Sequence, residues 1–515
     1  MQKTLIFNDD GWSTYMRYPA PMAPEDIVRA TVLPLVGSGV KIYQFCSLGS
    51  HAVNYRSDFL PLVGEWMKSK TGIDKIHVWR IRATIEYLAS QGTDPLKIVQ
   101  KACQEHGIEC HYSLRMNDGH HTYVRADGSQ EYPELFSDWL DNNRSLRLPS
   151  GRLNYACKEV RDYRRKQVED VLGRYPVDGI DLDFTRKRPW FLAGEEVKNA
   201  PVMTAFIREL SVRVRAKGRK FTARFEHDPQ MMLQSGLDVS AWLEEGLFDH
   251  ITLGTLGDHW PDPPVDWWVK RAKASGCLVC PGIEGQVYQL KTTVGGGTGT
   301  HASQDAMHDG YGPPSLEYMR AFAARAYKLG ADGISLFNFT CCDGEYSRAA
   351  LTELASEELL QFRPKQYVLA PWWPADEIRI YWSLFLSHVR LDPAQMETQR
   401  EFLIADDMEE ARRLNLERPS VLTLEMKNLN RIDDVEFILN GLKLCWNGHH
   451  YNHFDHGCWI DVIKFSVPLG VLQTGQNTLT LRRTKENAGF AGAVELRKFI
   501  LDQAFATGFS PGRLL

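Results

Sequence analysis

Short apolar runs rich in β-branched and aromatic residues alternate with amphipathic stretches along the first two thirds of the chain. In the amphipathic stretches apolar positions recur every three to four residues, which predicts helices. Strands that alternate with helices are typical of a parallel sheet with helical crossovers. The predicted strands are 4–9, 41–47, 109–117, 179–184, 220–226, 250–254, 277–284 and 333–339, and the predicted helices are 24–35, 94–107, 158–175, 201–218, 238–246, 262–276 and 315–330.

Eight such units predict an α/β fold, a (β/α)8 TIM barrel, over residues 1–358. Several of the predicted helices end in a glycine just before the next strand, as a helix C-cap favours. The alternative is an open, doubly wound sheet. It lacks support because neither GxGxxG nor GxxxxGK[ST] opens any of these helices.

The pattern changes in the last third of the chain, where short strand-like runs follow one another with little helical periodicity. A series of short strands separated by turn residues predicts a β-sandwich. The segment 363–376 contains three prolines and no helical pattern, so we place the boundary beside it and assign 359–515 to a smaller all-β sandwich domain. The predicted strands are 371–386, 421–428, 434–444, 459–470 and 477–483, with one helix at 406–415.

Composition and charge narrow the classes of partner. The chain has 515 residues, of which 43% are hydrophobic and 24% charged, as in a soluble globular protein. Its net charge of -5 argues against nucleic-acid binding. No apolar run is long enough to span a membrane, and the first residues lack a secretory signal, so we expect a cytoplasmic protein without membrane contact. The sequence leaves open whether the chain forms a homo-oligomer.

Metal-binding patterns are weak in this sequence. Ten cysteines are too few for a disulfide scaffold, and the CxxC at 277–280 lacks a second pair. The histidines at 449, 450, 453 and 456 lie close together, but such a run is more often a turn insertion between strands than a zinc site. We therefore expect neither a metal nor an organic cofactor.

The fourth predicted strand carries the first candidate acids. In a TIM barrel the active site lies at the carboxyl ends of the strands. In DGIDLDFTR, strand alternation puts Asp181 and Asp183 on one face. Two neighbouring carboxylates repel each other, which raises one pKa into a range suited to general acid catalysis. The alternative for Asp181 is a structural ion pair with an arginine inside the barrel.

Strands five and seven add further charged groups. Arg224 and Glu226 share a face of strand five, where Arg224 could hold a carboxylate by bidentate hydrogen bonds. Glu226 could be that carboxylate, a catalytic group, or half of a purely structural ion pair. Glu284 ends strand seven beside a glycine, as a rim carboxylate or as a solvated loop residue.

The other strand ends are rich in polar groups that suit hydroxyl binding. Candidate aromatic platforms for a ligand are Trp12, Trp190, Trp260, Trp267 and Trp268, although one or both of the last two are expected to pack against the barrel. The glycine-rich segment 292–314 predicts a mobile lid that could bring His301, Asp305 or His308 to the ligand; structureless filler is the alternative. The substrate-binding candidates are Asp10, Trp12, Arg115, Asn117, Asp118, Asp181, Arg224, Glu226, Asp258 and Asn338.

Two carboxyl groups that face each other across an aromatic-lined mouth suit glycoside hydrolysis, in which one protonates the leaving oxygen and the other attacks carbon or activates water. DGIDLDF, RFE on strand five, the glutamate ending strand seven and ADGISLFNF resemble the glycoside-hydrolase-like (β/α)8 proteins distantly related to xylanases and β-galactosidases. That resemblance implies an acid/base at Asp183 and a nucleophile at Glu284. The related enzymes usually have an asparagine–glutamate pair where Leu182 and Asp183 stand here.

Two other resemblances concern the same strand. DGIDLDF is similar to the chitinase motif DGxDxDxE, but Thr185 occupies the position of the catalytic glutamate, which speaks against that chemistry. A resemblance to α-galactosidase-type barrels implies Asp183 as the nucleophile and Asp258 as the acid. The C-terminal third resembles the accessory β-sandwiches of carbohydrate-active enzymes.

The sequence therefore predicts a hydrolase that cleaves O-glycosidic bonds of an oligosaccharide or glycoconjugate, with Asp183 and Glu284 as catalytic residues. Two alternatives stay open. One is a barrel that binds carbohydrate without catalysis, and the other is a metal-dependent lyase or isomerase acting on a sugar.

Overall fold

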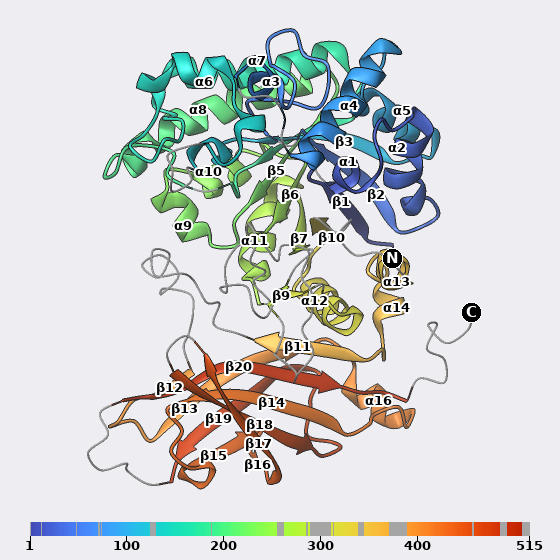
Figure 1. The fold of residues 1–515 in the computed structure, drawn as a ribbon. Coiled ribbons are helices and arrows are strands. Elements are labelled where there is room, and N and C mark those ends of the chain that lie inside the picture. The colour runs from blue at the N-terminus through green and yellow to red at the C-terminus, as the bar shows by residue number, and fades with distance from the viewer. Residues whose placement is uncertain are drawn as a thin grey trace.

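Eight parallel strands close into a barrel in the computed structural model (Figure 1), in the order β1-β10-β7-β6-β5-β4-β3-β2. Their bounds agree with the predicted strands to within two residues at either end. The barrel strands are β1 Thr4–Asp9, β2 Val40–Cys46, β3 Glu109–Arg115, β4 Gly179–Asp183, β5 Lys220–Phe225, β6 His250–Leu253, β7 Leu278–Glu284 and β10 Gly333–Phe337. Two short strands, β8 Val287–Tyr288 and β9 Tyr311–Gly312, pair with each other outside the barrel.

The structure describes most of the chain. The described residues are 2–11, 13–47, 49–70, 73, 75–123, 130–186, 188–254, 262–284, 287–288, 311–312, 314–337, 345–369, 389–455, 458–484 and 492–506.

Helices surround the barrel and cover the outward face of its strands with apolar side chains. Polar caps begin several of them: Asp94 accepts a hydrogen bond from Lys97 N at the start of α5, and Ser315 accepts one from Tyr318 N at the start of α12. The helices are α1 Ser13–Arg17, α2 Pro24–Thr31, α3 Glu65–Lys70, α4 Ile76–Ser90, α5 Pro95–Glu105, α6 Asp138–Asn142, α7 Lys158–Arg174, α8 Glu196–Arg215, α9 Pro229–Gln234, α10 Val239–Glu244, α11 Val265–Ala272, α12 Leu316–Lys328, α13 Glu345–Glu353 and α14 Glu357–Leu360.

Helix α4 is absent from the predicted elements although it is among the longer helices of the barrel. Its solvent side carries Ile76 and Trp79, which are 61% and 48% exposed. Apolar residues on both sides blur the helical period on which the prediction depends.

The last third of the described chain forms a β-sandwich, as predicted. One sheet has the order β11-β20-β14-β18-β17 with β12 beside β20, and the other has the order β13-β19-β15-β16. Side chains such as Leu424 and Phe499 of the first sheet pack against Phe437 and Leu481 of the second. The elements are β11 Lys365–Leu369, β12 Val389–Leu391, β13 Glu397–Ile404, α16 Met408–Arg413, β14 Ser420–Lys427, β15 Val435–Leu439, β16 Leu442–Lys443, β17 Trp446–Asp455, β18 Cys458–Val467, β19 Gly475–Arg483 and β20 Val494–Gln503.

The histidine-rich segment corrects one prediction. It belongs to strand β17 rather than to a turn insertion, and His450 Nε2 lies 2.7 Å from an Asp461 carboxylate oxygen on the neighbouring strand β18. A period of two is hard to recognise where most positions are polar. Position 456 lies outside the described residues.

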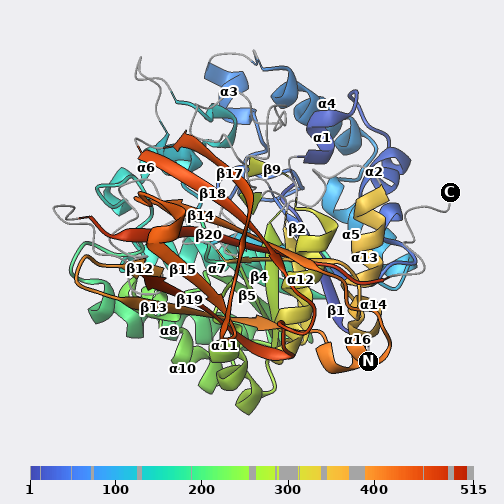
Figure 2. The same ribbon diagram turned by 90° about the horizontal axis from the view of Figure 1, so that it is seen from below.

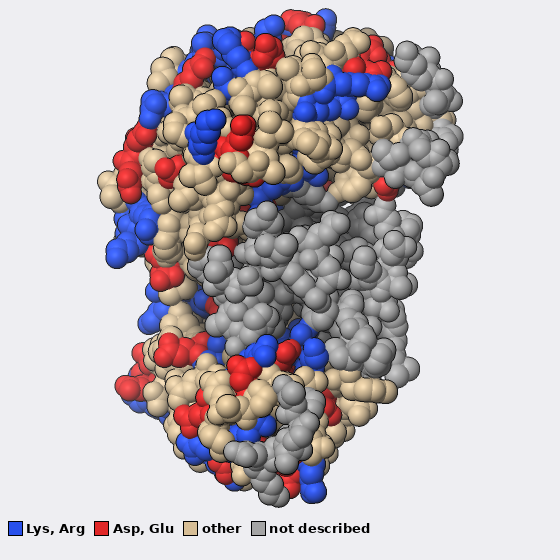
Figure 3. All heavy atoms as spheres, turned by 90° about the vertical axis from the view of Figure 1, so that its left-hand side faces the viewer, with Lys and Arg blue, Asp and Glu red and all other residues tan. Residues whose placement is uncertain are grey.

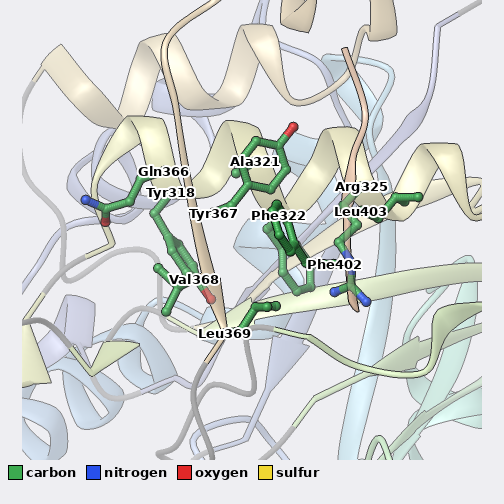
Figure 4. A pocket seen from close by; sticks show the side chains of 10 residues that line it. All are labelled: Tyr318, Ala321, Phe322, Arg325, Gln366, Tyr367, Val368, Leu369, Phe402 and Leu403. Atoms are coloured by element: carbon green, nitrogen blue, oxygen red, sulfur yellow. The ribbon is translucent and has the colours of Figure 1, made fainter. Parts of the chain in front are cut away.

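Barrel and sandwich meet along α12 and β11, which lie side by side in Figure 1. Figure 4 shows a small apolar pocket there, between Tyr318 and Phe322 of α12 and Leu369 of β11. An ion pair also crosses the junction, where Asp262 beside the barrel contacts Arg400 of β13 at 2.7 Å. Seen from below in Figure 2, the sandwich lies in front of the barrel.

Lysine, arginine and acidic side chains intermingle over the described part of the face in Figure 3. Within the described residues, no helix combines the length and the apolar character needed to cross a bilayer.

Candidate active site

The carboxyl ends of three neighbouring strands bring charged side chains to one level of the barrel. Arg115 of β3 pairs in register with Asp183 of β4, and Asp183 pairs with Arg224 of β5. Residues in direct register on parallel strands point to the same side of the sheet. Here that side is the interior of the barrel, because the preceding residues Leu114, Leu182 and Ala223 face the helices. All three charged side chains are buried.

Asp183 is held as an ionised carboxylate. Its Oδ1 accepts hydrogen bonds from Thr185 N at 2.9 Å and Thr185 Oγ1 at 2.6 Å. Its Oδ2 lies 3.3 Å from Arg186 Nε and 3.9 Å from Arg224 Nη1. Burial raises the pKa of Asp183, but the two guanidinium charges and the Thr185 hydrogen bonds outweigh it and lower the pKa below its ordinary value.

Glu284 ends β7 and is 3% exposed, which rules out a solvated loop residue. Arg224 Nη2 donates a hydrogen bond to Glu284 Oε1. Burial is the largest influence on this carboxyl and raises its pKa to about 7, against the lowering charges of Arg224 and Arg186, while the negative charge of Asp183 raises it further. Glu284 therefore exchanges its proton near neutral pH.

Arg224 joins the two acids, because one guanidinium contacts both Asp183 and Glu284. Its position is set by an aromatic ring and a glycine. The guanidinium carbon lies 3.8 Å from the centre of the Phe337 ring, and Phe337 pairs in register with Glu284. A Cβ on Gly254, just after β6, would lie 2.8 Å from Arg224 Nη2 and 3.1 Å from Glu284 Oε1. The ion pair thus fills the space that a side chain at position 254 would need.

Asp181 lies deeper in the barrel than Asp183. Its carboxylate accepts hydrogen bonds from Ser113 Oγ at 2.7 Å and Thr222 Oγ1 at 3.0 Å. Burial raises its pKa to about 6. The suggested ion pair with an arginine is wrong, since the two hydroxyls take that place.

The ion-pair partner of Glu226 differs from the one that the sequence suggested. Among the described residues, Glu226 pairs with Arg188 at 3.5 Å, and Arg224 contacts Glu284 and Asp183. Burial is the main cause that raises the pKa of Glu226. The sequence alone could not distinguish these pairings, because one joins two strands of the closed barrel and the other brings in Arg188 from the segment after β4.

The ends of β1 and β3 complete the described rim. Arg115 donates to the backbone carbonyl of Asp10 at 3.4 Å. Asp118 is buried and contacts His120 Nδ1; burial would raise the pKa of Asp118, but His120, Arg115 and Arg186 together lower it well below its usual range.

Asn117 is committed to the backbone rather than open to a ligand. Its Nδ2 donates to Pro189 O at 3.0 Å, and its Oδ1 accepts from Leu153 N at 3.2 Å. The side chain therefore ties together the loops after β3 and β4, and we expect it to support the site rather than to bind a sugar hydroxyl.

Two of the predicted aromatic platforms are buried in the core of the barrel. Trp190 is fully buried against Tyr155 and Phe184, and Trp268 is fully buried against Phe225, so these two are packing residues. Trp267 is partly buried and stacks under Arg271. Several predicted residues lie outside the described part of the chain: Trp12, Asp258, Trp260, His301, Asp305, His308 and Asn338.

Three residues of the site were not singled out from the sequence: Arg186, Gly254 and Phe337. Thr185 was considered only for its place in the chitinase motif. Thr185 and Arg186 lie two and three residues after Asp183, and their closeness to the strand end was the available signal. Gly254 and Phe337 act through space on residues of other strands, which no local pattern reveals. Within the described residues, no group of three or more histidine, cysteine, aspartate or glutamate side chains is arranged to hold a metal ion.

Comparisons with known proteins find similarity to solved structures at low sequence identity. No family profile and no curated protein sequence matches the chain. Its fold is similar to the group IV chitinase of Ostrinia furnacalis (13% identity, TM-score 0.42, covering 70% of this chain and 99% of that one). It is also similar to a chitinase from Bacteroides thetaiotaomicron (10% identity, TM-score 0.39, 70% and 98% covered).

A third similarity extends over 97% of the chain and 57% of a cycloisomaltooligosaccharide glucanotransferase from Paenibacillus sp., at 10% identity and a TM-score of 0.33. Similarity at this level does not identify a shared reaction, so the chemistry of the site follows from its own residues.

Proposed function

We propose that the protein is a glycoside hydrolase that cleaves O-glycosidic bonds of an oligosaccharide or glycoconjugate, with Asp183 and Glu284 as its carboxylate pair. One observation carries the proposal. Two buried carboxyl groups at the mouth of the barrel contact the same guanidinium, yet the pKa of one is lowered and that of the other is raised to about 7. Neighbouring carboxyls with pKa values driven apart are the arrangement that acid/base hydrolysis of a glycoside needs.

The two environments suggest a role for each group. Glu284, protonated up to neutral pH, donates its proton to the glycosidic oxygen as the bond to the leaving group breaks. Asp183 stays ionised and either attacks the anomeric carbon or activates the water that does. This assignment exchanges the roles that the resemblance to xylanase-type barrels implies. Arg224 keeps both carboxyls in place and offsets the negative charge of Asp183.

Substitution by the matching amide tests the pair. Product release from a panel of aryl glycosides and oligosaccharides is measured by chromatography for native protein, Asp183→Asn and Glu284→Gln. We expect each variant to lose about a hundredfold or more in kcat, the lower end of what a positioned acid, base or nucleophile contributes. Glu109→Gln, the same change at the opposite end of the barrel, serves as the control and keeps full activity.

The leaving group separates the roles. A dinitrophenyl glycoside needs no proton on its leaving oxygen, so Glu284→Gln regains much of its rate on this substrate and Asp183→Asn does not. Recovery in Asp183→Asn instead would reverse the assignment, and full activity in either variant would remove that residue from the mechanism.

A second candidate is a barrel that binds carbohydrate without cleaving it. The hydrogen bond from Arg224 to Glu284 favours it, because a carboxyl tied to a guanidinium is less free to transfer a proton. Under this alternative, glycans bind equally to native protein and both amide variants, and no product accumulates over hours.

A further inference from the structure

Arg186 follows β4 and reaches into the centre of the mouth. Its side chain is 7% exposed, and its Nε lies 3.3 Å from Asp183 Oδ2. The guanidinium carbon lies 5.2 Å from the centre of the Phe337 ring, which restricts the plane of the group. Its charge also acts on Asp118 after β3 and on Glu284 of β7, so Arg186 stands between opposite sides of the barrel.

One terminal nitrogen of this guanidinium has no hydrogen-bond partner among the described residues. The atom Nη2 is buried and donates no hydrogen bond to any residue that the structure describes. Within the described part of the chain, the side-chain hydrogen bond of Arg186 is donated by Nε to Asp183. The terminal edge of an arginine offers parallel N–H groups whose spacing matches the two oxygens of a carboxylate, sulfate or phosphate. Leaving a buried donor of a charged group unsatisfied costs more than leaving a neutral one, so this edge is suited to receive an anion.

The charges around Arg186 also favour the binding of an anion. Arg115 lies close enough that its charge, after burial, is the second cause lowering the pKa of Arg186. Two acids partly offset the charge of Arg186: Asp183, which is also in contact with Arg224, and Asp118, which contacts His120. Two guanidinium groups crowded together in a buried mouth repel each other, and an added negative charge relieves that repulsion.

We propose that Arg186, with Arg115 beside it, binds an anionic substituent of the saccharide, so that the substrate is an acidic sugar. The inference rests on the proposed function and specifies its substrate class. The recognised chemistry is a compact anion with at least two oxygens in one plane, which either a uronic acid carboxylate or a sulfate ester provides. The anion would sit next to Asp183, where it also fixes the sugar ring relative to the acids.

Binding measurements with matched glycans test the proposal. The probes are oligogalacturonides and chondroitin sulfate oligosaccharides, each compared with its carboxyl-reduced or desulfated counterpart, and neutral cello- and chito-oligosaccharides. Isothermal titration calorimetry on native protein is expected to show at least tenfold tighter binding of one acidic series than of its neutralised form. Loss of preference after carboxyl reduction identifies a uronic acid, and loss after desulfation identifies a sulfate.

Variants assign the effect to Arg186. Arg186→Met is expected to weaken binding of the acidic member at least tenfold more than binding of the neutral member, so that the preference is lost. Arg186→Lys keeps the charge without the planar edge and retains a partial preference, which gives a second readout should the methionine variant fold poorly. The control is Arg208→Met, which removes an exposed arginine paired with Glu245 and leaves binding unchanged.

The outcomes separate the two proposals. Equal binding of acidic and neutral members by native protein, or an acidic preference that survives in folded Arg186→Met, overturns the inference. Acidic sugars that bind through Arg186 without being cleaved support the inference and count against the hydrolase. Cleavage of neutral sugars without any preference for acidic ones supports the hydrolase and overturns the inference.

Discussion

Both ends of the barrel carry buried or half-buried charged groups. The pKa of one carboxyl group at the amino end is lowered, whereas the pKa values of two carboxyl groups at the carboxyl end are raised. At the amino end, Lys220 Nζ contacts the two carboxylate oxygens of Glu109 at 2.7 and 2.8 Å, and His111 lies 3.1 Å from the same group. The His111 hydrogen bond and Lys220 lower the pKa of Glu109 to about 2. Glu109 thus has Lys220 and His111 beside it, and the buried His250 stacks on the His111 ring.

At the carboxyl end, burial makes two of the carboxyl groups harder to ionise. Burial raises the pKa of Asp181 to about 6 and that of Glu284 to about 7, and Arg186 Nη2 has no acceptor within the described residues. Asp181 and Glu284 still accept hydrogen bonds from Ser113, Thr222 and Arg224, so their raised pKa values come from burial and not from missing partners. The comparison indicates that the half-exposed ion pair at the amino end favours the ionised form of Glu109, whereas burial at the carboxyl end favours the protonated forms of Asp181 and Glu284.

Removal of one cation from each end gives the largest contrast. Arg224→Met leaves Asp183 and Glu284 buried without their shared cation, so we expect the free energy of unfolding to fall by about 3 kcal/mol or more. Lys220→Met removes a more exposed partner and costs less than about 1 kcal/mol. Urea denaturation of both variants measures the difference. Equal losses in the free energy of unfolding would mean that the two cations stabilise the barrel to the same extent.

The pH dependence of activity follows from the carboxyl end alone. Because Glu284 must be protonated to act as an acid and its pKa is about 7, kcat/KM is expected to be level in mildly acidic buffer and to fall above pH 7. The decrease approaches about tenfold per pH unit. Since the pKa of Asp183 is lowered, the acid limb lies below the ordinary aspartate range. A profile measured from pH 3 to 9 tests this, and a maximum at pH 9 would contradict the role of Glu284.

Gly254 offers a smaller perturbation of the carboxyl end. In Gly254→Ala the new methyl group would lie within 3.1 Å of both Arg224 and Glu284, so the ion pair must shift. Overpacking of this kind costs roughly 1–3 kcal/mol. We expect kcat to fall about tenfold, in line with that energy, while the circular dichroism spectrum stays native. The control is Gly173→Ala in α7, where a Cβ has nothing within 4 Å and activity should not change.

The smallest effect belongs to Glu109. Its folded-state pKa is lowered, so its stabilising contribution is present above the unfolded value of 4.5 and disappears as the pH falls toward 2. Its side chain is 38% exposed, and solvent screening limits the contribution to less than about 1 kcal/mol. Thermal unfolding of Glu109→Gln and native protein should therefore differ slightly at pH 7 and converge near pH 2. A difference that grows with acidity would mean that the pair does not act as described.

Part of the site could be predicted from local pattern. The period of two on β4 correctly placed Asp181 and Asp183 on one inward face, and the end of β7 placed Glu284 at the rim. The same reasoning did not distinguish their environments. Asp181 meets two hydroxyls and Asp183 meets two guanidiniums, although they are two residues apart on the same strand.

The amino-acid sequence by itself determined the order of the elements and the strand ends that carry polar groups, because hydrophobic periodicity is a local property that burial on one face imposes. Tertiary structure alone decided that Arg224 belongs to Glu284 rather than to Glu226, that Trp190 is a packing residue, and that Gly254 leaves room for an ion pair. Those relations join residues on different strands and loops. Their energies depend on distance and on exclusion from water, which are set only when the barrel has closed.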